Sequence, residues 1–582
     1  MKKLSFIAQQ TPHQWFNFWL LFFCQLSIEL GNFYYSPNPL NHLPQFLLVR
    51  IMLIAGWHCF FILCSKAAFT LSRKLKKVIN GLETGLTLTV FLFEGYLLRM
   101  YKTHLTDSLC IVILASNRQE CQEFLNGIIL NNLVVLSLFL LLLASLSIII
   151  TRYTLKYQSK LWVHCIFLFA LVTMLSLSAL RAKNCYMAKI PISTNSSCGI
   201  DRIIWNPQVA NMIRIRIGRQ INNMLSPQHL KTFQFKSPFK TSIDIVLILG
   251  ETARADYLSA YGFPVKTSPK LDSLILTGDA FCFNDARTAA NRTIFSGHRI
   301  FTFWNDAKGK EWSDFPDLIS CFKKAGYKTK WFTNQETEGE NSIERIFGKP
   351  AHELRTPHGT TGGVVAPIGY DEEILPVVKG YGGLETLENS HIGQFTVIHL
   401  MGSHYEYKAR YPRNFKRFGA QDVPKKKGAV KDERVAEYMN SILYTDHILD
   451  ALYAYYRERP ALVIYLSDHG ESLYDDHDLP DLCGHGGRAC IEQADIPFVI
   501  MLTPSFRSTY PNLSKQLYDA RYRPISTAWL TNTLTLTAGI RTKYSDEQYN
   551  FFGEKFSPHR TRKTEGEGGY FSYPAIKKRR VK

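Results

Sequence analysis

Five long apolar runs in the first 180 residues constrain the fold of this chain more than any other feature. A helix needs about 20 mostly apolar residues to cross the hydrocarbon core of a bilayer. The runs of that length are Gln14–Tyr34, Pro44–Cys64, Ile79–Met100, Gly127–Ile150 and Leu161–Leu180. The third run is the weakest because it contains charged residues, and it could instead form a soluble amphipathic helix. We predict an N-terminal transmembrane domain of five helices over residues 1–180.

The positions of lysine and arginine favour this odd number of crossings. Cytoplasmic loops of membrane proteins are enriched in these two residue types. They gather before the first run and after the second and fourth, at Lys2, Lys3, Arg73, Lys74, Lys76, Lys77, Arg152, Lys156 and Lys160. The N-terminus is then cytoplasmic, and the chain beyond Leu180 lies outside. Glu94, in the third run, is costly in hydrocarbon, so we expect it either to contact substrate or to hydrogen-bond a neighbouring helix.

The remaining sequence predicts a connector over residues 181–239 and one α/β domain over residues 240–582. Short runs rich in branched and aromatic residues are typical of strands buried on both faces of a sheet. They recur at Ile243–Leu249, Lys328–Thr333, Phe395–Leu400, Ala461–Leu466 and Phe498–Leu502. Helical patterns such as Arg434–Arg457 lie between these runs. The alternation predicts a largely parallel sheet that is covered by helices on both faces.

The amino-acid composition and the predicted export of the second domain limit which binding partners and which disulfide bonds we expect. A content of 46% hydrophobic and 20% charged residues excludes a disordered or collagen-like chain. The net charge of +19 would suit a nucleic-acid-binding protein, but an exported domain does not meet nucleic acid, so we expect no such partner. Cysteines on the exported side can be oxidised, and short loops favour the pairs Cys185–Cys198 and Cys483–Cys490.

Polar residues follow directly after the predicted strands, where α/β sheets carry their sites. Glu251 follows the first strand, and Asp468 and His469 follow the fourth. Two further histidines, His404 and His485, lie shortly after the third and fourth strands. Zinc binds carboxylate oxygens and imidazole nitrogens, and it keeps one position open in catalytic sites. The sequence therefore predicts a catalytic metal site at this edge of the sheet.

Three motifs resemble the phosphoethanolamine transferases. They are LGETARADYLSAYGFPVKTSPKLDSL at Leu249–Leu274, GSHYEYKARYP at Gly402–Pro412 and SDHGES at Ser467–Ser472. Members of this family are multi-pass proteins of the bacterial inner membrane. They join a five-helix membrane domain to a periplasmic catalytic domain with an alkaline-phosphatase/sulfatase-like fold. The resemblance implies the same architecture, location and zinc-dependent enzyme class for this chain.

The resemblance also implies roles for individual residues. Glu251, Asp468 and His469 match the family's zinc ligands. A threonine that ligates the metal and acts as nucleophile is expected some forty residues after the first strand. We prefer Thr293, and Thr288 is the alternative. The two further histidines, His404 and His485, would hold a second zinc ion or bind the phosphate.

The implied reaction is transfer of phosphoethanolamine from phosphatidylethanolamine to lipopolysaccharide, on a core sugar or lipid A, or to another periplasmic glycan. A covalent phospho-threonine intermediate would form on the way. The segment Asp285–Ser296 lacks the cysteines typical of members that act on lipid A, and so looks more like members that modify core sugars. We expect a monomer. The alternatives are a membrane-anchored phosphodiesterase or sulfatase-like hydrolase, a glycerol-phosphate transferase, and a non-catalytic glycolipid-binding protein.

Overall fold

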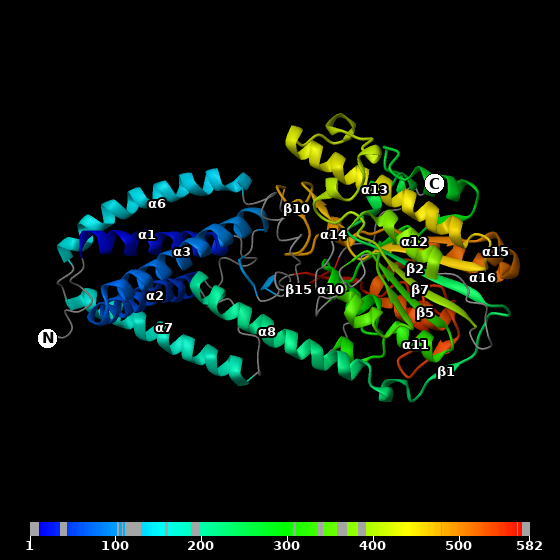
Figure 1. Cartoon of the computed structure of the whole chain (residues 1–582), viewed down its shortest axis with the longest axis horizontal. Helices are drawn as coiled ribbons and strands as arrows, with labels where there is room; N and C mark the ends of the chain where they lie inside the picture. Colours follow the sequence, from blue (N-terminus) through cyan, green and yellow to red (C-terminus); the bar gives the residue numbers. More distant parts are fainter. Residues whose placement is uncertain are drawn as a thin grey trace. The chain divides into compact units, whose positions relative to one another are not determined.

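The computed structural model describes residues 11–34, 43–101, 104–106, 109–110, 130–157, 161–187, 198–305, 310–335, 337, 342–357, 369–381, 392–478, 480–566 and 569–572. The chain divides into two compact units, Met1–Arg216 and Ile217–Lys582. Figure 1 shows a helical N-terminal unit and a C-terminal unit that is built around a sheet.

Long helices form the N-terminal unit and coincide with the five apolar runs. They are α1 (Pro12–Tyr34), α2 (Leu43–Leu71), α3 (Arg73–Tyr101), α6 (Leu130–Tyr157) and α7 (Leu161–Met187). Among the described residues, Leu47–Leu71 and Ser137–Lys156 are long and apolar enough to cross a membrane, and the apolar stretch Cys165–Ala179 is shorter. The positions of the helices were therefore predicted correctly, while the five-span topology stays a prediction.

Two details of the N-terminal unit differ from expectation. The basic residues expected in a loop after the second run lie instead in the first turn and a half of α3, because α2 ends at Leu71 and α3 begins at Arg73. The segment expected as a connector contains the helix α8 (Gly199–Met224). The sequence did not predict this helix for two reasons. Many of its residues are polar, and it contains Pro207, a residue type that usually ends a helix.

Glu94 lies in a buried ion cluster of the N-terminal unit. Both of its carboxylate oxygens accept hydrogen bonds from Arg202 of α8, at 2.7 and 2.6 Å. Arg202 also donates to Glu29 of α1 at 2.5 and 3.3 Å, and Arg50 of α2 lies 3.0 Å from Glu29. Glu94 thus bonds to a neighbouring helix, which was one of its two expected roles.

A seven-stranded sheet forms the centre of the C-terminal unit, in the order β3-β11-β8-β2-β7-β5-β6. Its strands are β2 (Ile243–Gly250), β3 (Ala280–Cys282), β5 (Lys328–Thr333), β6 (Glu353–Arg355), β7 (Gly393–His399), β8 (Ala461–Ser467) and β11 (Phe498–Leu502). Smaller two-stranded pairs are formed by β1 (Gln234–Phe235) with β13 (Ile540–Arg541), β4 (Asp285–Arg287) with β12 (Pro524–Ser526), β9 (Ser472–Leu473) with β10 (Cys483–Gly484), and β14 (Lys563–Gly566) with β15 (Gly569–Ser572). All five strands predicted from the sequence belong to the large sheet.

The large sheet is mixed rather than uniformly parallel. β2 pairs in parallel with β7 and β8, and β5 continues the parallel part. β11 runs antiparallel to β8 and to β3. A parallel return needs a crossover connection, usually a long helix. Between β8 and β11 the described chain contains the short strands β9 and β10 and the four-residue helix α14 (Ile491–Ala494), with no long crossover helix, and β11 runs in the opposite direction.

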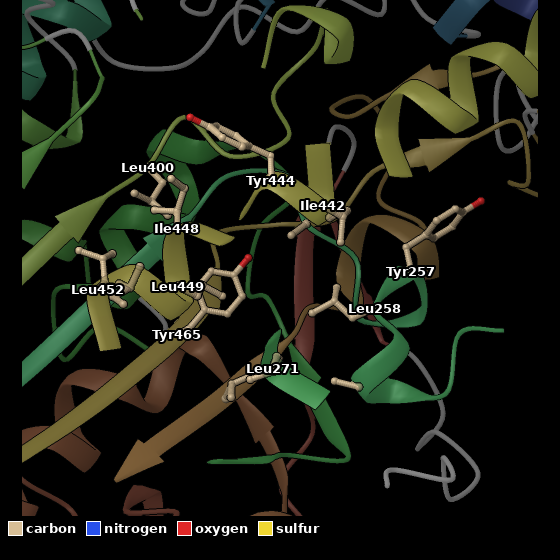
Figure 2. Packing of buried hydrophobic residues seen from close by; sticks show 14 of the residues in the cluster. Tyr257, Leu258, Leu271, Leu400, Ile442, Tyr444, Ile448, Leu449, Leu452 and Tyr465 are labelled. Atoms are coloured by element: carbon tan, nitrogen blue, oxygen red, sulfur yellow. The ribbon is translucent and has the colours of Figure 1, made fainter. Parts of the chain in front are cut away.

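Helices cover both faces of this sheet. They are α9 (Pro269–Leu276), α10 (Thr293–Ile300), α11 (Leu318–Lys324), α12 (Ile374–Tyr381), α13 (Ala429–Tyr456), α15 (Pro504–Thr509), α16 (Pro511–Asp519) and α17 (Leu530–Thr537). On one face, Ile442, Leu449 and Leu452 of α13 pack with Tyr465 of β8, as Figure 2 shows. On the other, Phe322 of α11 stacks on Phe395 of β7 with ring centroids 4.1 Å apart. This packing fixes the strand ends that carry the site.

The predicted disulfides are not formed where the structure describes the thiols. Cys483 and Cys490 are both free, and the Sγ of Cys483 lies 3.4 Å from the hydroxyl of Tyr407. The Sγ of Cys490 instead lies 3.3 Å from Ser472 Oγ. Cys198 is also free, and the side chain of Cys185 lies outside the described residues. The thiols of the second predicted pair thus face different partners.

Candidate active site

Three of the predicted ligand residues meet at the carboxyl edge of the large sheet. Glu251 follows β2, and Asp468 and His469 follow the end of the adjacent parallel strand β8. All three side chains are buried, and their potential ligand atoms lie within 4.8 Å of one another. Neighbouring parallel strands end at the same edge, so the topology itself brings these residues together.

The turn after β2 holds Glu251 in place through a strained backbone. Thr252 has a φ of 64°, which is rare for a β-branched residue. Its amide donates to Asp468 Oδ1 at 3.2 Å and its hydroxyl donates to Glu251 Oε1 at 2.9 Å. Gly402, with a φ of 55°, packs against the same turn, and a Cβ there would lie 2.7 Å from the carbonyl oxygen of Glu251. The strain is thus located at Thr252, directly beside the ligand residue Glu251.

Thr293 is the first residue of α10, and its hydroxyl faces this cluster. Its Oγ1 lies 3.3 and 3.4 Å from the two carboxylate oxygens of Glu251 and 3.3 Å from Nε2 of His469. The Oγ1 of Thr288 instead donates to the carbonyl oxygens of Asp468 and Ala290, at 2.5 and 2.9 Å. The geometry therefore sets the Thr293 hydroxyl among the acidic and imidazole groups, while the Thr288 hydroxyl braces the backbone.

The hydrogen bonds of His469 indicate that a cation belongs in the cluster. Its Nδ1 lies 2.9 Å from the carbonyl oxygen of Gly470, which can only accept, so Nδ1 donates. The Nε2 of a neutral ring then has a lone pair, yet it faces Glu251 Oε1 at 3.3 Å and Asp468 Oδ2 at 3.2 Å. Asp468 Oδ2 is buried and accepts no hydrogen bond from the described residues. Facing acceptors of this kind need a proton or a metal ion between them, so the residues fit zinc.

Burial and the charges within the cluster shift the pKa values of Asp468, His469 and Glu251. Burial and the nearby charge of Glu251 raise the pKa of Asp468 to about 7. Burial would lower the pKa of His469, but the charges of Asp468 and Glu251 outweigh it and raise that pKa to about 10. Burial would likewise raise the pKa of Glu251, but its hydrogen bond to His469 and the charges of the histidines hold it well below the ordinary value. Without a metal, protons take the place of the cation.

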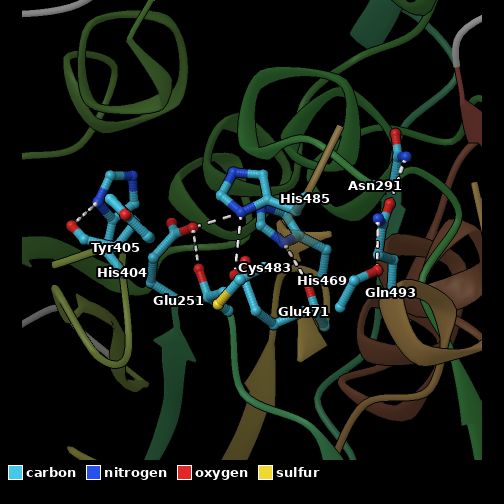
Figure 3. Close-up of polar contacts among 12 residues, drawn as sticks. Glu251, Asn291, His404, Tyr405, His469, Glu471, Cys483, His485 and Gln493 are labelled. Atoms are coloured by element: carbon cyan, nitrogen blue, oxygen red, sulfur yellow. Dashed lines mark hydrogen bonds and ion pairs between the residues drawn. The ribbon is translucent and has the colours of Figure 1, made fainter. Parts of the chain in front are cut away.

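His404 and His485 form a second cluster that shares Glu251. The ligand atoms of these three residues also lie within 4.8 Å of one another. His485 Nδ1 donates to the buried carboxylate of Glu471 at 3.1 Å, and His404 Nδ1 donates to the carbonyl oxygen of Tyr405 at 3.2 Å. Figure 3 shows Glu251 and both histidines with these partners. Each neutral ring then has its lone pair on Nε2, the arrangement that metal-binding histidines adopt.

Two residues of the site were missed by the sequence analysis. Glu471 lies in the SDHGES motif, but only its contact with His485 reveals its role. Arg292, directly before Thr293, is 7% exposed and lies 4.3 Å over the ring of Phe295. Its positive charge adds to burial and to the neighbouring histidines in holding the pKa of His485 well below its ordinary value. The sequence could have indicated Arg292 as a site residue because it directly precedes the expected nucleophile, Thr293.

Comparison with known proteins agrees with this geometry. Residues 243–540 match the sulfatase family. The phosphoethanolamine transferase EptC of Escherichia coli (strain K12) is 29% identical over 331 residues, which cover 55% of this chain and 54% of that protein. The chain therefore spans about half the length of the curated relative it matches.

Solved structures extend the comparison. The C-terminal periplasmic domain of E. coli EptC, crystallised in complex with Zn, is 26% identical and has a TM-score of 0.52, with 58% of this chain and 94% of that one covered. The integral membrane protein lipooligosaccharide phosphoethanolamine transferase A of Neisseria meningitidis is 17% identical, with a TM-score of 0.56. It covers 94% of this chain and 97% of its own, and it supports the fold alone. The chain belongs to the sulfatase family, and within that family it is similar to phosphoethanolamine transferases.

Proposed function

We propose that this protein is a zinc-dependent enzyme that transfers phosphoethanolamine from phosphatidylethanolamine to lipopolysaccharide, on a core sugar or lipid A, or to another periplasmic glycan. The N-terminal unit anchors it in the bacterial inner membrane through five spans within residues 1–180, and residues 240–582 act in the periplasm as a monomer. The observation that carries the proposal is the approach of the Thr293 hydroxyl to Glu251 and His469, at 3.3 Å from each.

In this proposal, Glu251, Asp468, His469 and Thr293 hold a zinc ion. Bound zinc would lower the pKa of a coordinated hydroxyl and offset negative charge on the phosphoryl oxygens. The chain itself supplies the rest of the site. Thr293 opens α10, so the first backbone N–H groups of that helix are available for phosphoryl oxygens. His404 and His485 bind the phosphate or hold a second zinc ion.

The reaction proceeds in two displacements. The Thr293 oxygen attacks the phosphorus of the donor, the bond from phosphorus to the diacylglycerol oxygen breaks, and diacylglycerol leaves with a proton. Phosphoethanolamine is then esterified to Thr293. In the second step an acceptor hydroxyl attacks the same phosphorus, the bond to Thr293 breaks, and the threonine hydroxyl regains a proton. Positioning and charge stabilisation supply most of the catalysis in such transfers.

The proposal is tested by mass spectrometry of lipids and glycans from cells that express the wild type, Thr293→Ala or Thr288→Val. We expect a phosphoethanolamine increment on the acceptor with the wild type and with Thr288→Val, and none with Thr293→Ala. A covalent adduct on Thr293 should be found in the purified enzyme incubated with donor alone. An increment that survives Thr293→Ala would reject this nucleophile. Release of free phosphoethanolamine without an acceptor would instead identify a hydrolase, and a glycerol-phosphate increment would identify a different transferase.

A further inference from the structure

The C-terminal hairpin, defined here as the antiparallel strands β14 (Lys563–Gly566) and β15 (Gly569–Ser572), lies outside the residues that match the sulfatase family. Its backbone nevertheless pairs with the segment that leads to Thr293. The amide of Asn291 donates to the carbonyl oxygen of Glu565 at 3.0 Å, and the amide of Glu565 donates to Ala289 at 2.8 Å. The hairpin therefore provides backbone hydrogen bonds for an irregular stretch that belongs to no strand of the large sheet.

Side chains strengthen this pairing on both sides of Thr293. The hydroxyl of Thr564, which is 1% exposed, donates to the carbonyl oxygen of Thr288 at 2.7 Å. Arg299, in the last turn of α10, is fully buried and lies 2.7 Å from the carboxylate of Glu565. The stretch before the nucleophile and the helix after it are thus both tied to the hairpin.

The same hairpin packs against the loop that carries His485. A Cβ on Gly566 would lie 2.3 Å from the backbone nitrogen of Ala489, so only glycine allows this close approach. The guanidinium of Arg488 lies 5.8 Å from the ring centroid of Phe571. The hairpin consequently contacts two segments of the site that are almost two hundred residues apart in the sequence: the nucleophile segment and the loop of the second histidine.

We propose that the C-terminal hairpin is a positioning element for catalysis, and that Thr564 is a positioning residue that sets the Thr293 hydroxyl against Glu251 and His469. This inference rests on the proposed function of Thr293. A misplacement of about 1 Å at a reacting group can lower a rate by about 100-fold. Without the Thr564 hydroxyl, the carbonyl of Thr288 loses a buried donor, and the stretch up to Thr293 can shift.

The test compares Thr564→Val with Thr445→Val in the full chain. Both replacements keep the shape of a buried threonine and remove a hydroxyl that donates to a backbone carbonyl; Thr445 donates to Ser441 within α13 at 3.1 Å. We expect Thr564→Val to lower kcat by about 10- to 100-fold with little change in KM for the donor and unchanged zinc content. Thr445→Val should stay within about twofold of the wild type, and Thr564→Ser should restore most of kcat.

Hydrogen exchange gives a readout that does not depend on turnover. The peptide that contains residues 288–293 should exchange at least about tenfold faster in Thr564→Val than in the wild type, while a peptide from α13 should not change. If Thr564→Val does not fold, Gly566→Ala serves instead, with Gly380→Ala as its control because a Cβ on Gly380 meets no atom within 4 Å. We expect Gly566→Ala to lower kcat and Gly380→Ala to leave it unchanged.

The outcomes separate this inference from the proposed function. If Thr293→Ala is inactive and Thr564→Val turns over as fast as Thr445→Val, the positioning role is wrong and the nucleophile stands. Equal loss of kcat in both threonine variants would likewise reject a specific role for the hairpin. If Thr293→Ala remains active, the proposed nucleophile is wrong, and the exchange measurement alone then decides whether the hairpin orders residues 288–293.

Discussion

Replacing Asp468 with asparagine should stabilise the metal-free protein while it weakens zinc binding. In the folded chain the buried carboxylates of Asp468 and Glu251 face the same nitrogen of His469, at 3.2 and 3.3 Å. Such an arrangement favours a cation and is costly without one. Asparagine keeps an oxygen that can accept from the amides of Thr252 and His469, as Asp468 Oδ1 does, but it carries no charge.

The magnitude follows from the pKa of Asp468, which rises from an ordinary 3.8 to about 7. That difference corresponds to about 4 kcal/mol that favours the protonated form in the folded state. Part of it is offset because ionised Asp468 also stabilises the proton on His469. We therefore expect Asp468→Asn to raise the unfolding free energy of the metal-free protein by about 2 kcal/mol near pH 8.

The pH dependence has a definite sign. A carboxyl group whose pKa is raised on folding binds more protons in the folded than in the unfolded state. The stabilising contribution of Asp468 is therefore complete below about pH 4 and is lost as the pH rises to about 7. Metal-free wild type should lose stability across this window, and Asp468→Asn should lose less. With saturating zinc the order reverses, because ligand binding stabilises the wild type more than the variant.

Pulse proteolysis of the full chain in urea, in detergent with either EDTA or excess zinc, measures these free energies by the survival of the catalytic unit. Asp495→Asn offers a control, because Asp495 is also a buried aspartate but belongs to neither proposed metal cluster. The reasoning is refuted if Asp468→Asn destabilises the metal-free protein, or if its zinc-dependent stabilisation equals that of the wild type.

Three further predictions concern residues around the site and in the membrane unit. Gly402→Ala should lower the free energy of unfolding by about 3 kcal/mol and should also lower kcat, because the new Cβ strains the backbone and clashes with Glu251. Gly278 also has a positive φ but has open space around it, so Gly278→Ala should cost only about 1 kcal/mol. Thermal unfolding and turnover of the two variants separate the cost of backbone strain from that of the clash. Glu471→Gln replaces the carboxyl group that faces Nδ1 of His485 and should lower kcat/KM by about 10- to 100-fold; unchanged kinetics would contradict the orienting role. Arg202→Met leaves two buried carboxylates without this partner and should destabilise the N-terminal unit by about 3–5 kcal/mol; an unchanged Tm in detergent would show that the ion cluster adds nothing.

Much of the catalytic unit could be predicted because its strands are buried on both faces. Every residue of β2 is buried, and apart from Asp244 its sequence is an apolar run whose end is easy to locate. Glu251, Asp468 and His469 follow such ends directly, and parallel pairing brings them together without further information. Local sequence therefore contains most of what defines the first ligand cluster.

Features that depend on distant pairing could not be predicted in this way. The apolar run Phe498–Leu502 reads the same in either direction, so its sequence does not indicate which way β11 runs. The hairpin partner of residues 289–291 is the polar stretch Lys563–Gly566, which has no apolar pattern of its own. The role of Glu471 depends on which nitrogen of His485 it contacts. Such facts appear only once the chain is folded.

Anomalous X-ray diffraction at the zinc edge tests the central claim most directly, because it locates the metal independently of activity. The account predicts a strong peak at about 2.0–2.2 Å from oxygen or nitrogen atoms of Glu251, Asp468, His469 and Thr293, present in the wild type and lost in Asp468→Asn. Active protein with no peak at these four side chains would contradict it.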